Sequence, residues 1–132
     1  MKPKVKNWIT QLNNGVIKSK TTKVIYQINK HTREGRGWTT IEELRMELSM
    51  PHQTLTAIVS NIQDEGLIDT FGEIQNEQGT TFQKIRYAKP DERETLKRQR
   101  ELEKLAHWIK RGKEEFSHLL PASTLRELNN LN

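Results

Sequence analysis

Cysteine is absent from the 132-residue sequence. Disulfide bridges, thiolate metal ligands and cysteine nucleophiles are therefore excluded. Long apolar runs are absent as well: no stretch approaches the roughly 20 residues that span a bilayer, and the opening MKPKVKNWITQLNNG lacks the apolar block of a signal peptide. These absences lead us to expect a cytoplasmic protein with no membrane partner.

Glycine and proline are scarce, with seven and four residues, and only 6% of the residues are aromatic. Hydrophobic residues make up 33% and charged residues 30% of the chain. This composition is too apolar for a disordered chain and too polar for a membrane protein. The length suits one compact domain with extensions.

Cations are scarce in the middle of the chain, although the net charge is +5. Residues 1–37 hold nine Lys or Arg against one carboxylate, residues 38–87 hold three against eight, and residues 88–132 hold ten against eight. A polyanionic partner would therefore meet positive charge mainly at the N-terminal end, whereas the middle is acidic.

Residues 1–18 are predicted to form a basic N-terminal arm that carries a short amphipathic element. Apolar residues at helical spacing begin after this arm. A helix is predicted from Ser19 to Gly35, because its apolar residues share one face and hydroxyl residues can cap its start. The apolar residues of this face are Val24, Ile25 and Ile28.

A pair of helices joined by a tight turn is predicted next. Thr39 or Thr40 can open the first helix, because each is followed three residues later by a glutamate. Proline is accepted at the first position of a helix but not inside one, so the second helix begins at Pro51 and ends at Gly66. Apolar residues recur at helical spacing in both: Ile41, Leu44 and Leu48, then Leu55, Ile58, Val59 and Ile62.

Alternating apolar residues predict a β-hairpin over residues 67–88 with a polar tip. A long helix from Asp91 to about Arg111 follows, with a bend or break at Gly112, and a last short helix starts at Thr124. The long helix begins an apolar seam formed by Leu102, Leu105, Ile109, Phe116 and Leu119. The seam either covers the protein's own core or pairs with a second copy, and we favour the homodimer.

Catalytic signatures are missing from the sequence. The four histidines, His31, His52, His107 and His118, are scattered and have no second ligand at zinc spacing. Neither a Gly-rich phosphate loop nor a Gly-x-Ser-x-Gly elbow occurs. We therefore expect no enzyme, no catalytic residue, no metal site and no cofactor. The three tryptophans are expected to anchor the core or an interface: Trp8, Trp38 and Trp108.

The segment WTTIEELRMELSMPHQTLTAIVSNIQDEGLI resembles the winged-helix part of MarR-like regulators. In PHQTL and QDEGLI it is still more similar to small bacteriophage winged-helix DNA-binding proteins. The resemblance implies a mainly α fold with a small β-hairpin, a winged helix-turn-helix over residues 19–88, with helical extensions at 1–18 and 89–132. Residues 51–65 would form the recognition helix, and residues 73–81 would form the wing.

The resemblance also implies contacts with double-stranded DNA. Gln and Asn suit adenine edges, Ser and Thr suit several bases or phosphates, and alanine leaves room for a thymine methyl. The candidates on the recognition helix are His52, Gln53, Thr54, Thr56, Ala57, Ser60 and Asn61. Because this helix has no Lys or Arg, cations elsewhere must contact the phosphates. The candidates are Lys20, Lys23, Arg36, Lys84 and Arg86, with Lys18, Lys30 and Arg33 beside them. For any single cation the alternative is a solvated surface position.

Two functions from different classes follow. The first is a sequence-specific DNA-binding protein, a phage transcriptional regulator working in the host cytoplasm. The alternative is a winged-helix protein-interaction module, a phage factor that docks on host RNA polymerase or on the replication machinery. The acidic middle of the chain favours the alternative, and the polar outward face of the recognition helix favours the first.

Overall fold

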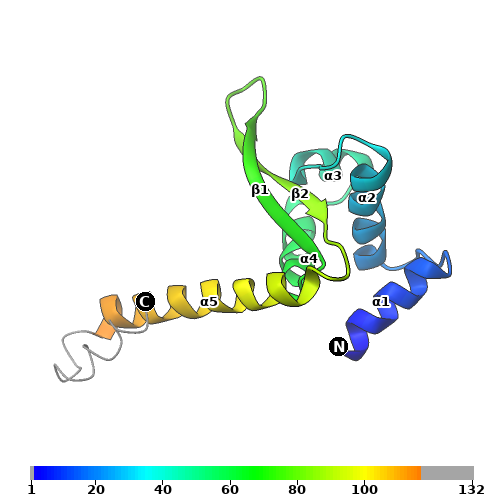
Figure 1. Ribbon diagram of the computed structural model, residues 1–132. Coiled ribbons are helices and arrows are strands. Elements are labelled where there is room, and N and C mark those ends of the chain that lie inside the picture. The colour runs from blue at the N-terminus through cyan, green and yellow to red at the C-terminus, as the bar shows by residue number, and fades with distance from the viewer. Residues whose placement is uncertain (1, 117–132) are drawn as a thin grey trace. The chain divides into compact units, whose positions relative to one another are not determined.

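The computed structural model describes residues 2–116 and is mainly helical, with one small antiparallel sheet (Figure 1). This agrees with the predicted fold class. The chain divides into two compact units, Met1–Lys97 and Arg98–Asn132. None of the described helices is long and apolar enough to cross a bilayer. The elements are α1 (Pro3–Asn13), α2 (Lys20–Glu34), α3 (Ile41–Leu48), α4 (His52–Asp64), β1 (Ile68–Gln75), β2 (Thr81–Tyr87) and α5 (Arg93–Phe116).

Hydroxyl caps set the starts of α2 and α3. Ser19 Oγ accepts a hydrogen bond from the Thr22 N–H at 3.1 Å, which confirms the predicted start of α2. Thr40 Oγ1 accepts one from the Glu43 N–H at 3.2 Å. Of the two caps that the sequence allowed for α3, Thr40 is therefore the one used. Thr39 instead donates its hydroxyl to the Glu43 carboxylate at 2.7 Å.

Helix α4 begins at His52, one residue after the predicted start, because Pro51 is extended with φ −58° and ψ 145°. Its end is as predicted. Gly66 adopts the left-handed φ of +74°, and the Leu67 N–H donates to the Ile62 carbonyl at 3.1 Å. A Cβ at residue 66 would also collide with the carbonyl oxygen of Arg93, so both φ and packing demand glycine here.

Strands β1 and β2 form the predicted hairpin, with Ile68 opposite Tyr87 and Phe71 opposite Lys84. Figure 1 shows this hairpin projecting from the helices of the first unit. The register shifts between Phe71 and Glu73, where Gly72 takes a φ of +59°. A bulge of this kind bends the strand, so it changes the direction of the outer part of the hairpin.

The segment between α2 and α3 pairs with β2 through one isolated antiparallel bridge, Thr39 with Ile85. The Thr39 N–H donates to the Ile85 carbonyl at 2.8 Å, and the Ile85 N–H donates back at 2.7 Å. The order of helix, bridge, helix, turn, helix and hairpin is compatible with a winged helix-turn-helix. Because the backbone of Thr39 is held in this bridge, Thr40 is the residue left to cap α3.

One hydrophobic core joins the four helices before the hairpin to the hairpin itself. Helix α1 adds a buried Val5 and packs Trp8, Ile9 and Leu12 against the core. The segment predicted as a basic arm is thus mainly a helix packed on the core. The fully buried apolar residues contributed by the other elements are Val24, Ile25, Ile28, Leu44, Leu55, Ile62, Leu67, Ile68 and Ile85.

Helix α5 begins at Arg93, two residues after the predicted Asp91, and continues through Gly112 to Phe116. The break predicted at Gly112 is therefore wrong. A glycine costs only about 1 kcal/mol in a helix, and the neighbouring Lys, Arg and Glu are good helix formers. The predicted helix from Thr124 lies outside the described residues, as do His118 and Leu119.

In the second unit, the described part of α5 exposes three large apolar side chains. Leu102 is 59% exposed, Leu105 is 50% exposed and Trp108 is 70% exposed, whereas Ile109 is buried. The first half of the predicted seam is therefore an open apolar surface on this helix.

Candidate nucleic-acid interface

The outward face of α4 carries the side chains that the sequence assigned to DNA. Leu55, Ile58, Val59 and Ile62 face the core, and the opposite side is left for polar groups. His52, Gln53, Thr56, Ala57 and Asn61 are exposed there, and Thr54 and Ser60 are partly exposed. The predicted set is thus placed on the solvent side of one helix, with hydrogen-bonding groups and no carboxylate.

Glu65, at the end of α4, is turned away from that face. Its side chain is only 5% exposed and is surrounded by Lys2 Nζ at 3.1 Å, Lys4 Nζ at 3.8 Å and Lys97 Nζ at 3.6 Å. These lysines offset the charge of a carboxylate that would otherwise repel phosphate. Glu65 at the end of α4 therefore fastens α1 and the first turn of α5.

His52 stands in the first turn of α4. Its Nε2 lies 3.4 Å from the Thr56 hydroxyl, one helical turn on. The contact is long for a hydrogen bond, so both groups keep donors or acceptors for a ligand.

Five exposed cations of the first unit lie on and beside α2. Lys20 and Lys23 are exposed in its first turn. Lys18, Lys30 and Arg33 are exposed as well. Across residues 2–116, none of these five side chains has an ion-pair partner.

Trp38 holds two of the predicted cations against its ring. The Arg36 guanidinium carbon lies 3.9 Å from the ring centroid and Lys84 Nζ lies 5.0 Å from it. Arg36 also donates to both oxygens of Glu43, at 2.9 and 3.0 Å. Lys84 has a second ring below it, that of Phe71 at 5.9 Å. Unlike Arg36, Lys84 has no carboxylate partner in the described part of the chain.

Arg86 is clamped between carboxylates. Its guanidinium donates to Asp69 at 3.0 Å and to Glu92 at 2.6 Å. The hydrogen bond with Glu92 raises the pKa of Arg86, and it holds the pKa of Glu92 at about 2. Arg86 thus joins both strands to the start of α5, and a phosphate would have to compete with two ion pairs for it.

A groove lies between the hairpin and the start of α3. Its volume is about 440 Å³, and its aromatic walls are Trp38 and Phe82. The other lining residues are Arg36, Thr40, Glu42, Ile74, Gln75 and Asn76. The sequence did not predict this groove, because its residues come from two segments that are far apart in the chain and meet beside the Thr39–Ile85 bridge.

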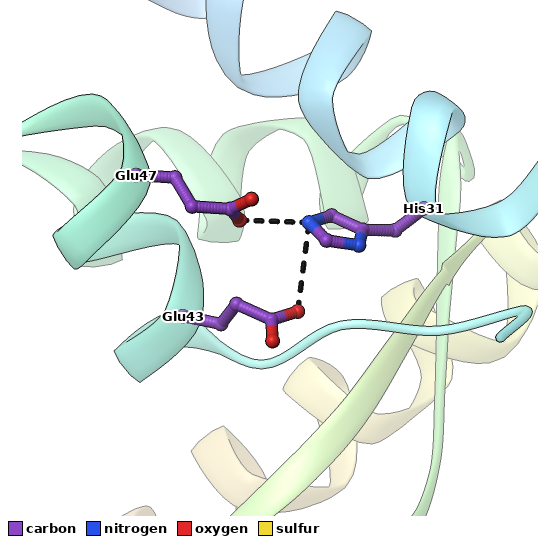
Figure 2. Close-up of side chains that lie close together, drawn as sticks. All are labelled: His31, Glu43 and Glu47. Atoms are coloured by element: carbon purple, nitrogen blue, oxygen red, sulfur yellow. Dashed lines mark hydrogen bonds and ion pairs between the residues drawn. The ribbon is translucent and has the colours of Figure 1, made fainter. Parts of the chain in front are cut away.

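A histidine and two glutamates also meet between α2 and α3 (Figure 2). His31 Nε2 lies 2.7 Å from Glu47 Oε1 and 3.5 Å from Glu43 Oε1. Sequence reasoning treated the four histidines as scattered. The signal that could have found this group is the spacing of Glu43 and Glu47, one turn apart on a helix that packs against the end of α2.

No protein-family model matches the chain, and no curated protein matches it either. The arrangement of α2, α3, α4 and the hairpin is compatible with a winged helix, and the resemblance to MarR-like regulators rests on the sequence segment alone.

Proposed function

We propose that the protein binds double-stranded DNA in a sequence-specific manner, with α4 in the major groove and the hairpin against the neighbouring backbone. The observation that carries the proposal is the outward face of α4 from His52 to Asn61, which is mostly polar, has no carboxylate and is at least partly exposed, with Asp64 following at the end of the helix. Such a face presents amide and hydroxyl groups that match base edges. By its resemblance to MarR-like regulators and to small phage winged-helix proteins, the protein would regulate transcription.

In this proposal, one element recognises the bases and other elements contact the phosphates. Gln53 and Asn61 on α4 would specify bases, and Lys20 and Lys23 on α2 with Lys84 on β2 would contact phosphates. Arg36 and Arg86 were candidates for phosphate contacts too, but protein carboxylates already engage them. They serve better as supports of the hairpin and of the segment before α3.

Selection from a random duplex library tests the proposal directly. We expect one sequence family to be enriched, and the logarithm of its affinity to fall linearly with the logarithm of salt concentration, because lysines displace counterions from the phosphates. Failure to enrich any sequence, together with a salt slope near zero, would reject the proposal.

A protein-interaction module is the second candidate. It is favoured by the groove between the hairpin and α3, where Trp38 and Phe82 could receive an apolar side chain of a partner. The partner would be a host protein such as RNA polymerase or a replication factor. Capture from host lysate followed by nuclease treatment separates the two candidates, because a protein partner remains bound once nucleic acid is removed.

The exposed seam of α5 supports dimerisation in either case. Leu102 and Leu105 lie on one face of the helix, and both are at least half exposed. A second copy would cover them, and two copies would bring two recognition helices to two half-sites.

A further inference from the structure

We propose that His31, Glu43 and Glu47 bind one divalent transition-metal ion, with zinc the best-suited cation. One ligand atom from each side chain lies within 4.8 Å of the other two, and Figure 2 shows the imidazole directed at both carboxylates. The proposal does not rest on DNA binding, because none of these three side chains is among those proposed to contact DNA.

The distances suit a tetrahedral zinc site. Metal–ligand bonds of about 2.0–2.2 Å place neighbouring ligand atoms about 3.3 Å apart. The separation of His31 Nε2 from Glu43 Oε1, 3.5 Å, is already close to this value. The separation from Glu47 Oε1, 2.7 Å, would widen by roughly half an ångström. A side-chain movement of this size needs no change in the helices.

Neighbouring groups hold the carboxylates in place. Gln27 Nε2 donates to Glu47 Oε2 at 3.0 Å, which leaves Oε1 of that carboxylate turned to the histidine. The Thr39 hydroxyl donates to Glu43 Oε1 at 2.7 Å, and Arg36 donates to both oxygens of that carboxylate, so Glu43 would exchange one of these hydrogen bonds for the bond to the ion. Hydrogen bonds of this kind orient metal ligands. The backbones are fixed because buried residues of α2 and α3 pack in the same core.

The charge of the cluster also favours a cation. Burial alone would raise the pKa of Glu43, but hydrogen bonds from Thr39 and Arg36 outweigh it and keep the pKa below its ordinary value. Glu43 and Glu47 together carry two negative charges, and Arg36 offsets one of them. With a neutral imidazole, one negative charge remains for the ion.

The donor set selects the class of metal. One imidazole nitrogen and two carboxylate oxygens suit Zn²⁺ and its neighbours, whereas Mg²⁺ and Ca²⁺ prefer oxygen alone. The side chains of His31, Glu43 and Glu47 are 18%, 29% and 34% exposed, so the ion can enter from solvent and a water can complete its coordination. The ion would tie the end of α2 to α3.

Titration of the full chain with metal tests the proposal. Chelator-treated protein would be titrated above pH 7 with Zn²⁺ by calorimetry and with Co²⁺ by visible absorption. We expect one equivalent to bind, a Co²⁺ spectrum of low coordination number, and no comparable binding of Mg²⁺. His31→Ala and Glu47→Gln should each weaken the affinity about tenfold or more.

His107→Ala is the matched control, because His107 is exposed on α5 and belongs to no such cluster of described residues. It should leave the one-equivalent binding unchanged. Circular dichroism of each metal-free variant shows whether it is folded, and Glu47→Gln retains the size of the side chain should His31→Ala fail to fold. The proposal is overturned if the wild type binds no tighter than Glu47→Gln, or if His107→Ala removes the binding.

Discussion

Gly66 shows how one residue can be fixed by two independent constraints. Its φ of +74° is unfavourable for residues with a Cβ, and the space beside its Cα is filled by the carbonyl of Arg93. The turn after α4 and the first turn of α5 can therefore approach each other only across a glycine.

Gly66→Ala should lower the free energy of unfolding by about 2–4 kcal/mol, because left-handed strain of about 1–2 kcal/mol is joined by a steric clash. Gly79→Ala is the control, since Gly79 has a φ of +80° but no atom within 4 Å of the position that a Cβ would take. It should show the backbone strain alone. Urea denaturation measures both, and equal losses would mean that the Arg93 contact is unimportant.

The Arg86–Glu92 pair predicts a pH dependence of stability. The pKa of Glu92 is about 2 in the folded protein against an ordinary value of 4.5, so its ionisation stabilises the fold above pH 4.5. That contribution disappears as the pH falls to about 2. Glu92→Gln should therefore have a lower Tm than the wild type at pH 7, and the difference should close between pH 4.5 and 2.

Thermal melting of both proteins across this pH range measures the effect. Glu73→Gln is a suitable control, because Glu73 is exposed on the hairpin and has no ion-pair partner among residues 2–116. It should follow the wild type at every pH. A Glu92→Gln deficit that stays constant down to pH 2 would contradict the assigned ion pair.

At the scale of the element, base recognition by α4 and phosphate contact by α2 can be tested separately. Gln53→Ala and Asn61→Ala should reduce discrimination between the enriched duplex and a scrambled one, by about 1–3 kcal/mol for each lost bidentate contact. Replacing Lys20 and Lys23 by Ala should weaken binding to both duplexes alike and reduce the salt slope by roughly 2.

Fluorescence anisotropy at several salt concentrations distinguishes these effects. Lys89→Ala provides a control cation, since Lys89 is exposed between β2 and α5 rather than on the proposed phosphate-binding helix. If the lysine double variant loses sequence preference, or the α4 variants lose only salt dependence, the proposed division is wrong.

Local features of the sequence predicted the elements well. The start at Ser19, the turn at Gly66 and the hairpin all follow from residues close together in the chain, and the same is true of the polar face of α4. The residue that caps α3 could not be predicted from the sequence, because Thr39 and Thr40 were equally suitable. The pairing of Thr39 with Ile85 leaves Thr40 as the cap.

Features built from distant segments could not be predicted in this way. The sequence offers Arg86 as a free cation, and nothing local shows that Asp69 and Glu92 will surround it. The meeting of His31 with Glu47 likewise depends on how α2 packs on α3. Site residues are thus predictable where one helix carries them all, and unpredictable where packing assembles them.

At the scale of the whole molecule, the acidic middle of the chain is less repulsive to DNA than its composition indicates. Glu43 pairs with Arg36, and Glu65 pairs with Lys2, Lys4 and Lys97, and all four of these cations come from outside residues 38–87. Those ion pairs lower the negative charge that a phosphate would meet. This internal pairing favours the DNA-binding proposal over the protein-interaction alternative.

The hairpin retains unpaired carboxylates, Glu73 and Glu77, within the described part of the protein. If the hairpin lies against the DNA backbone, both charges oppose binding. Replacing the two by Gln should tighten binding by several-fold at low salt, and the gain should shrink as salt rises because the repulsion is screened. Unchanged affinity at low salt would place the tip of the hairpin away from the duplex.

The exposed apolar face of α5 predicts that the molecule self-associates. Leu102→Glu with Leu105→Glu would put two charges on its open apolar face, so a wild-type dimer should become monomeric when its mass is measured by light scattering. Affinity for an enriched site with two half-sites should then fall toward that for a single half-site, because the linkage of two recognition helices is lost. Lys110→Glu, roughly a third of a turn away from these leucines, changes charge on the same helix and should leave the dimer intact. A wild type that is monomeric at all concentrations would contradict the dimer and assign the seam to the protein's own chain.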